Sequence, residues 1–497
     1  MAAGSVEATT TGRGKHARGS HALGGSKPGS VGIAVSTPAF WQPLLVFFIV
    51  SLHLHLEESG YGSNCEPFKT DSTTSPHRVN MSVNLDIEKS RYRQFVPDKG
   101  WAELRGLDIR DPYTYSEQIV DSPLFQDIWK KWSANLAAPF YGITSDGVRR
   151  DGIYRLQYEG APTRNMVEAA KAVIDSLSPS ERSLAVLALE SEDYRKWSNP
   201  EMVLFKCGVR LEQLEQTKVE RIMHLLRQSL SEKGFEKLRG AMKTNKFLGE
   251  LCGCEAILNE KSYSFTIFGE PSETKPWRYM LFGHHLCLNT FVVGQQMVIG
   301  PVFIGAEPCL IDEGPDAGIE ICSKEGDLGL EFMRSLPADL QRKAQTYANM
   351  HDDAMPEDRW NLADQRHLAG AFQDNRVIPY EGILASDMSR EQQEKLMAVA
   401  EAFLMLLPPK PLEARLKQVR DWLPETYFSW IGGYGPEEPF YYRIQSPVAL
   451  FEFDHHSGVF LTNRQPAKHH IHTVQRLPNG NDYGMALLTL AQMGEHA

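Results

Sequence analysis

The sequence predicts an α+β fold, in which a helical N-terminal half packs on a β-rich, mostly antiparallel C-terminal sheet. Apolar residues recur at helical spacing through residues 160–255, and aromatic and β-branched residues fill the stretches 260–310 and 425–476. Helices and strands come in separate runs rather than in strict alternation, which favours an antiparallel sheet. Because 42 % of the residues are hydrophobic, the chain has enough apolar material for a large core.

The helices are predicted from apolar periodicity and from capping residues. The segment 178–189 opens like a capping box, with Ser178 or Ser180 before Glu181. Residues 408–411 ("PPKP") are expected to break a helical stretch. The other segments with helical patterns are 162–177, 210–230, 232–251, 324–350, 389–421 and a short one near 485–493.

The strands are predicted from aromatic and β-branched runs between turn residues. These runs are 262–271, 277–294, 296–308, 426–434, 439–458, 458–463 and 469–476. No internal repeat stands out in the sequence, which argues against a repeat architecture.

The chain of 497 residues is long for one ordinary domain. We expect residues 1–80 to form a disordered N-terminal extension and residues 81–497 to form a single large α+β domain. The net charge of -11 argues against nucleic acid as a partner, because an acidic chain repels phosphate backbones. The seven cysteines are scattered, so we expect free buried thiols rather than a disulfide framework.

The apolar segment 39–56 within this extension has the polarity of a signal anchor, with basic residues before it and acidic residues after it. Its length is near the lower limit for crossing a bilayer. The alternative is a stretch without function, because Met81 opens a plausible domain start and no Asn-x-Ser/Thr sequon follows Asn80. Localisation therefore stays open between a single membrane anchor and the cytoplasm, and the oligomeric state stays open too.

Histidines gather in three short clusters of strand-like sequence. The clusters are His284 and His285; His455 and His456; and His469, His470 and His472. Residues two apart on a strand share a face, so "HIH" directs His470 and His472 to the same side. If the strands adjoin, three or four imidazoles converge, which is the ligand number of a mononuclear Zn, Fe or Cu site.

We therefore predict a divalent metal site with ligands among His284, His285, His456, His470 and His472. His456 is favoured over His455 because it shares a strand face with Glu452 and Asp454, which are candidates for a carboxylate ligand, a base or a partner of a ligand. A polar pocket without metal and a set of unrelated histidines are the alternatives.

Four further residues carry competing interpretations. Arg476, a candidate catalytic residue, either binds an anion or forms a salt bridge with Asp482 across the turn "LPNGN". Arg443 lies among aromatic residues and is a candidate for holding a substrate carboxylate. Glu307 in "GAEP" is interpreted as a turn residue rather than as a buried carboxylate.

Several motifs together resemble a family of unknown function found in bacteria and fungi, domain-of-unknown-function family 3500. They are "FGHHLCLN", "GAEP", "TYFSWIGG", "FYYRIQSP", "FEFD" and "HHIHTVQRLPNGNDYG", and the resemblance extends from Asp151 to the C-terminus. It implies the pattern of a His-His pair at His284 and His285 and an H-x-H at His470 and His472, followed by Arg476 and "DYG". It implies no reaction.

The preferred function is a metal-dependent enzyme acting on a small-molecule substrate, either by hydrolysis or by oxidation. The alternative is a non-catalytic protein that binds a small molecule or a metal in the same histidine-lined cleft.

Overall fold

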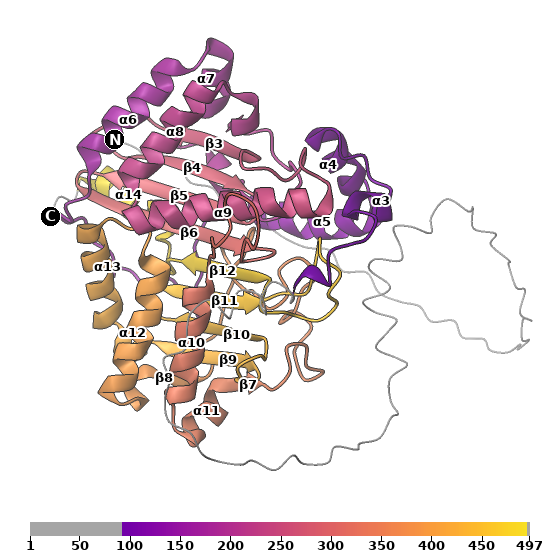
Figure 1. Cartoon of the computed structure of the whole chain (residues 1–497). Helices are drawn as coiled ribbons and strands as arrows, with labels where there is room; N and C mark the ends of the chain where they lie inside the picture. Colours follow the sequence, from indigo (N-terminus) through magenta and orange to yellow (C-terminus); the bar gives the residue numbers. More distant parts are fainter. Residues whose placement is uncertain (1–91, 495–497) are drawn as a thin grey trace, which may run out of the picture. The chain divides into compact units, whose positions relative to one another are not determined.

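The computed structural model describes residues 92–494, which lie in one compact unit of the chain (Figure 1). The fold is α+β, with helices packed against one large mixed sheet. The described helices are α3 (Trp101–Arg105), α4 (Pro112–Val120), α5 (Pro123–Ala137), α6 (Thr163–Ser176), α7 (Pro179–Ala185), α8 (Gln216–Ser229), α9 (Glu232–Cys252), α10 (Ser323–Ser335), α11 (Ala338–Ala344), α12 (Arg390–Leu404), α13 (Pro409–Asp421) and α14 (Met485–Met493).

The sheet has twelve strands in the order β1-β3-β4-β5-β6-β12-β11-β10-β9-β7, with β2 also paired to β3 and β8 to β9. Neighbouring strands are antiparallel except in the pairs β1–β3 and β7–β9. The strands are β1 (Val186–Leu187), β2 (Val209–Arg210), β3 (Tyr263–Phe268), β4 (Trp277–Gly283), β5 (Leu286–Val293), β6 (Gln296–Ala306), β7 (Gln345–Tyr347), β8 (Ile383–Leu384), β9 (Tyr427–Gly432), β10 (Phe440–Gln445), β11 (Leu450–His455) and β12 (Ile471–Arg476).

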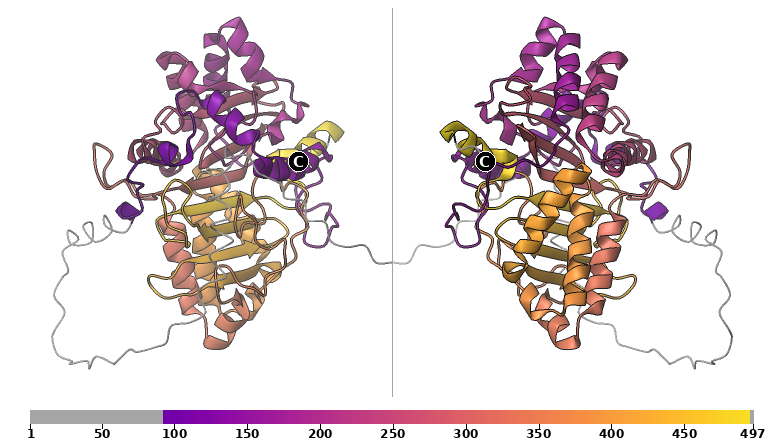
Figure 2. Two further views of the ribbon diagram at one scale, coloured as in Figure 1. Left: turned by 90° about the vertical axis from the view of Figure 1, so that its right-hand side faces the viewer. Right: turned by 90° about the vertical axis from the view of Figure 1, so that its left-hand side faces the viewer.

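The unit consists of two halves with the same topology, so the expectation of no internal repeat is wrong. In each half, two helices precede a short strand, and this strand lies parallel to the first strand of a four-stranded meander. In the first half the elements are α6, α7 and β1, and the meander begins with β3. In the second half they are α10, α11 and β7, and the meander begins with β9. Figure 2 shows the halves stacked along the sheet, the earlier in magenta and the later in orange and yellow. They meet where β6 pairs with β12.

The register supports this equivalence residue by residue. Phe265 pairs with Leu281, as Phe428 pairs with Ile444 163 positions later. The sequences "FTIFG" at 265–269 and "FSWIG" at 428–432 retain a trace of the repeat. Such a trace is too short and too divergent to be found before the pairing is known.

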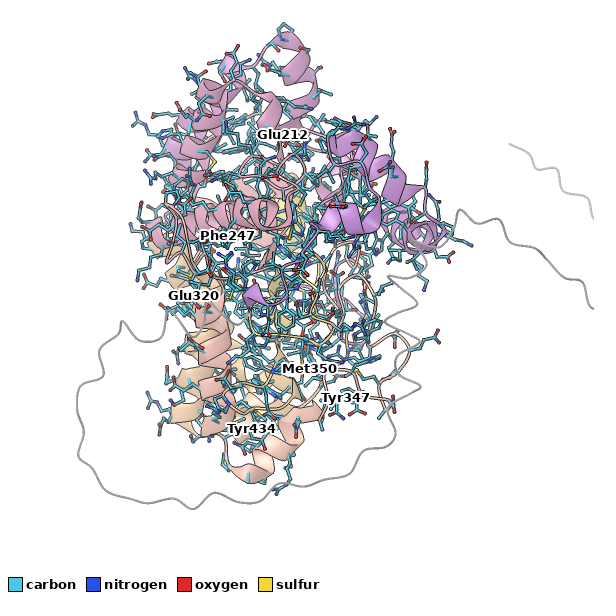
Figure 3. The ribbon with its side chains drawn as sticks, turned by 45° about the vertical axis from the view of Figure 1, so that its right-hand side comes forward. Glu212, Phe247, Glu320, Tyr347, Met350 and Tyr434 are labelled. Carbon is cyan, nitrogen blue, oxygen red and sulfur yellow. The ribbon has the colours of Figure 1, made fainter. Side chains whose placement is uncertain are left out.

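The two faces of the sheet are covered differently. One face packs against helices α6, α8, α9, α10 and α12 and forms the largest hydrophobic core. The other face packs against α5 and the segment 368–372. At the end of β7, Tyr347 and Met350, labelled in Figure 3, pack beside Ile431 and Tyr441. Polar side chains of the second face line the middle of the sheet, and the histidines are among them.

Most predicted elements are present. The capping box at Ser178 and Glu181 opens α7, and the short C-terminal helix is α14. The segment 458–463 is a loop rather than a strand, because the backbone N–H groups of Val459, Phe460 and Leu461 bond to a carboxylate instead of a strand. No element is predicted within residues 112–137, but they form α4 and α5.

The N-terminal expectations fall largely outside the described residues. The apolar segment 39–56 lies outside them, and within residues 92–494 no helix is long and apolar enough to cross a membrane. The six cysteines of the described part form no disulfide bond with one another.

Candidate metal centre

Four adjacent strands bring the histidine clusters together. β5, β6, β12 and β11 are neighbours in this order. His285 precedes β5, His472 lies on β12, and His456 follows β11. Beyond the end of the β11–β12 ladder, the N–H of His456 donates to the carbonyl oxygen of His470, so these two residues stay side by side. The three clusters, far apart in sequence, therefore meet at one end of the central strands.

His285 occupies a tight turn in a conformation that is rare for its residue type. His284 and His285 are the two residues between β4 and β5, whose ends Gly283 and Leu286 are paired. The φ angle of His285 is 60°, in the left-handed region that glycine adopts most easily. The turn aims its ring along the sheet toward β12.

Gly305 makes room between His285 and His472. It is the β6 residue paired with His472, and its N–H donates to the carbonyl oxygen of His285. A Cβ atom at Gly305 would lie 2.8 Å from Cδ2 of His472 and 3.0 Å from Cδ2 of His285. Because there is no side chain at this position, the two imidazoles approach each other across β6.

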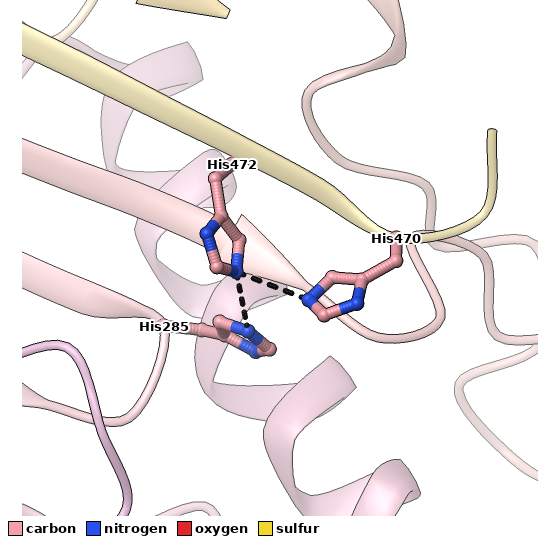
Figure 4. A group of neighbouring side chains, drawn as sticks. All are labelled: His285, His470 and His472. Carbon is pink, nitrogen blue, oxygen red and sulfur yellow. Dashed lines mark hydrogen bonds between the residues drawn. The ribbon is translucent and has the colours of Figure 1, made fainter. Parts of the chain in front are cut away.

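Three imidazole nitrogens converge on one point, as Figure 4 shows. Nε2 of His472 lies 3.0 Å from Nε2 of His285 and 3.0 Å from Nε2 of His470. Ligand atoms around a tetrahedral zinc ion are about 3.3 Å apart, so the rings would have to separate only slightly to hold such an ion. The side chains of all three residues are buried.

Three neutral histidine rings do not place enough protons here to make both 3.0 Å contacts hydrogen bonds. A neutral imidazole donates through one nitrogen and accepts through the other. Nδ1 of His470 lies 2.9 Å from the carbonyl oxygen of Ser457, which only accepts, so the proton sits on Nδ1 and Nε2 presents a lone pair. If the ring proton of His472 is on Nε2, that N–H can point to only one of the two neighbouring nitrogens, so the other contact is not a hydrogen bond. A cation at the meeting point would accept the lone pairs of all three rings.

Glu307 follows the last residue of β6 and lies beside this group of histidines. Its carboxylate accepts hydrogen bonds from the N–H groups of Val459, Phe460 and Leu461, at 2.8, 3.1 and 3.0 Å. One of its oxygens lies 3.6 Å from Nδ1 of His470. Burial raises the pKa of Glu307 to about 7. Glu307 is thus a buried carboxylate at a bend after β6, so the interpretation as a turn residue is correct for the backbone but misses the burial of the side chain.

A second group of three buried histidines shares His472. Nitrogens of His367, His456 and His472 lie within 4.8 Å of one another, as do those of His285, His470 and His472. The rings of His456 and His472 are 3.8 Å apart between centroids, and those of His367 and His456 are 5.7 Å apart. His472 therefore stands between two sets of potential ligands.

The two predicted carboxylates lie beside this second group. Oδ2 of Asp454 is 3.0 Å from Nε2 of His456, and Oδ1 accepts a hydrogen bond of 2.6 Å from Nε of Arg366. Glu452 accepts from the hydroxyl of Tyr441 at 2.6 Å, and its Oε2 lies 3.4 Å from Nδ1 of His367.

The electrostatics differ between the histidines. Burial lowers the pKa of His470 to about 3 and holds those of His285, His456 and His472 well below the usual range. Neutral imidazole is the form that binds a metal ion. Burial also opposes the charged form of His367, but the Glu452 carboxylate outweighs it and raises that pKa.

The structure places the predicted site residues as follows. His285, His456, His470 and His472 come together, with Asp454 and Glu452 adjacent. His284 lies outside both groups: its ring stacks on His285, and its Nδ1 lies 2.8 Å from Oδ1 of Asn245.

The remaining candidates have structural partners. His455 faces the opposite side of the sheet from His456, where its Nδ1 accepts from the N–H of Phe440. Arg443 binds Glu381 and the carbonyl oxygen of Pro379.

Arg476 is a structural residue in this arrangement. Its guanidinium is fully buried and donates to Asp482 at 2.8 Å and to Asp374 at 2.7 Å. It also donates to the carbonyl oxygens of Ala369 and Gly370. The salt-bridge interpretation with Asp482 is therefore correct, and the donors of Arg476 are occupied far from an open surface.

Sequence reasoning missed His367 and Gly305. His367 is an isolated histidine in the irregular segment between β7 and β8, where no periodicity indicates a direction. Nothing in the sequence distinguishes Gly305 from other glycines, because its role depends on its cross-strand partner His472.

A family model described as "Protein of unknown function (DUF3500)" matches residues 159–485. No curated protein and no solved structure matches the chain.

Proposed function

Because the chain belongs to the DUF3500 family of proteins of unknown function, whose description names no reaction, we propose from the site alone that it is a metal-dependent enzyme acting on a small molecule. The metal centre in this proposal is held by His285, His470 and His472. The observation that carries it is the convergence of three Nε2 atoms, two pairs of them at 3.0 Å, in a buried position.

The ligand set favours a catalytic over a purely structural ion. Structural zinc sites are closed by four protein ligands, whereas catalytic sites use three and keep a position for water or substrate. An ion there would supply Lewis acidity and an activated water, or a redox centre if it were iron or copper. Zinc, iron and copper all suit three imidazoles, so hydrolytic and oxidative chemistry both remain within the proposal.

The surrounding residues have defined roles in this proposal. Ser457 holds the proton of His470 on Nδ1 through its carbonyl oxygen, which keeps Nε2 directed inward. Asp454 and Glu452 are the nearest predicted carboxylates for accepting or returning a proton, and each is in contact with a histidine of the second group.

One observation favours the alternative of a non-catalytic metal-binding protein. The five histidines of the two groups are at most 3 % exposed, so no ligand reaches them without movement of the covering segments. A buried ion without an exchangeable position would stabilise the junction of the two halves instead of reacting.

Metal analysis tests the proposal. The full chain is stripped with chelator, reloaded with zinc and analysed by elemental analysis beside the variants His285→Ala and His470→Ala. His469→Ala is the matched control, because this neighbouring half-buried histidine bonds to Asn463 and belongs to neither group. We expect bound zinc in the parent and the control and, in the two variants, loss of the zinc ion that this centre holds. Retention of all zinc by both would overturn the proposal.

The same preparation separates the enzyme from the binding protein. Cobalt-loaded protein is titrated with azide while its visible spectrum is recorded. A spectral change indicates an exchangeable position and supports an enzyme; an unchanged spectrum with stoichiometric cobalt favours a closed, non-catalytic centre.

A further inference from the structure

We propose that the protein holds a second metal ion between His367, His456 and His472, so that the ring of His472 is shared by two ions. This inference rests on the centre proposed above and extends it from one ion to two. Four observations carry it: unpartnered polar atoms, the orientation of His472, the anchoring of His367, and the local charge.

Buried polar atoms without hydrogen-bond partners are concentrated at this position. They are both ring nitrogens of His367, Nε2 of His456, Nδ1 of His472 and Oδ2 of Asp454. Although Nε2 of His456 lies only 3.0 Å from Oδ2 of Asp454, the two atoms are not aligned as a hydrogen bond. Buried polar groups in folded proteins are nearly always satisfied, so such a group of atoms indicates something that they bind. For a group of neutral imidazoles, a transition-metal ion is such a partner.

The ring of His472 presents its two nitrogens to different neighbours. Its Cδ2 edge faces β6, since a Cβ at Gly305 would lie 2.8 Å away. Both short contacts, to His285 and to His470, end on Nε2 (Figure 4). Nδ1 is on the ring edge opposite Cδ2 and therefore faces β11, the strand that pairs with β12 on that side. An ion bound there would meet a nitrogen that the first centre does not use.

His367 is held in place as a ligand would need to be. The N–H groups of Leu368 and Ala369 both donate to the carboxylate of Glu452, at 2.9 Å each. Arg366 donates to Asp454 and to the carbonyl oxygen of His455. An irregular segment is thus bonded to β11 on both sides of His367, while neither nitrogen of its ring forms a hydrogen bond and Nδ1 lies 3.4 Å from Oε2 of Glu452. Ligands fixed by such contacts give a metal site its geometry.

The charge around the second group suits a cation. Asp454 and Glu452 are fully buried beside it, and only Asp454 forms a salt bridge with an arginine. Glu452 receives neutral donors from Tyr441 and from the backbone, and its ion-pair partner is His367. When His367 is neutral and binds an ion, the divalent ion would balance the charge of Glu452 in its place. Binding through both nitrogens of His472 requires its ring proton to leave for solvent when the second ion is loaded.

Zinc counting on the full chain tests this proposal through a pattern of losses. The parent and His469→Ala should bind two zinc ions per chain. His285→Ala should keep the second ion and lose the first, and His367→Ala should keep the first and lose the second, leaving one each. His472→Ala should lose both. Circular dichroism and thermal unfolding of each chelated variant show whether it is folded.

Four other patterns of zinc binding would overturn one or both proposals. One zinc in the parent, lost in His285→Ala and kept in His367→Ala, overturns the second ion and leaves the first centre standing. One zinc kept in His285→Ala but lost in His367→Ala overturns the first centre and the sharing. Two in the parent with one left in His472→Ala overturns the sharing. No zinc overturns both proposals.

Copper gives a second, independent readout. Two Cu(II) ions joined by one imidazole couple magnetically, so the electron paramagnetic resonance intensity of the doubly loaded parent should fall well below that of two isolated ions. In His367→Ala the remaining copper should show the full intensity of one. Full intensity of two isolated ions in the parent would overturn the sharing.

Discussion

His285 and His472 lie on opposite sides of strand β6, yet their Nε2 atoms are 3.0 Å apart. The contact exists because the residue between them is Gly305, which has no side chain to separate the rings. Strand neighbours are about 4.8 Å apart, so two side chains that flank a strand normally have a third between them. This relationship is the basis of the first prediction.

Replacing Gly305 by Ala should weaken metal binding. The new methyl group would meet both imidazoles at 3.0 Å or less, so the rings must move apart. We expect the zinc dissociation constant to rise roughly 10–100-fold, as for other changes that misorient ligands. Competition with a chromophoric chelator measures it. Gly435→Ala is the control, since its methyl meets only the flexible carboxylate of Glu438. Equal affinities for the two variants would contradict the prediction.

The backbone at His285 should favour glycine over alanine. Its φ angle of 60° strains any residue with a Cβ atom, and the strain costs about 1 kcal/mol relative to glycine. Both His285→Gly and His285→Ala remove the imidazole and should lose the same ion. In metal-free protein, however, His285→Gly should unfold at a higher urea concentration than His285→Ala. A less stable glycine variant would show that the turn is not strained.

Arg476→Lys should destabilise the fold. The guanidinium is buried and donates to two carboxylates and two carbonyl oxygens, which a lysine ammonium does not reproduce. We expect a loss of about 3 kcal/mol in the free energy of unfolding, as for a broken buried ion pair. Arg420→Lys is the control, because its ion pair with Glu394 is half exposed and contributes under about 1 kcal/mol. Urea unfolding compares the two variants; similar losses would refute a structural role.

Glu307→Gln should loosen the loop at 459–461. A carboxylate accepts all three N–H groups there, whereas an amide presents only one accepting oxygen. Hydrogen bonds to a charged acceptor are worth roughly 1.5–3 kcal/mol, so above pH about 7, where Glu307 is ionised, the amides of Val459, Phe460 and Leu461 should exchange with deuterium many-fold faster in the variant. Glu313→Gln, at an exposed carboxylate, should leave their exchange unchanged. Unaltered protection in Glu307→Gln would mean that other contacts hold the loop.

The α+β class, most helices and the central strands could be predicted from the sequence, because each depends on a local period. Alternation along "HHIHTVQR" predicts that His470 and His472 share a face, and they do. The same reasoning places His455 and His456 on opposite faces, and the structure shows His455 bonded to Phe440 away from the group. The capping box at Ser178 could be predicted too, because it involves only Ser178 and Glu181, which are three positions apart.

Only the tertiary structure decided which residues meet. The order β5-β6-β12-β11 brings His285 to His472, and the pairing of Gly305 with His472 leaves the room they need. His367 joins them from an irregular segment whose position depends on Glu452 and Asp454, far along the chain. The sequence by itself determined the face that each strand residue occupies, because side-chain direction follows from a repeat of two residues. Strand order, cross-strand register and loop anchoring depend on contacts between distant residues, and no local pattern encodes them.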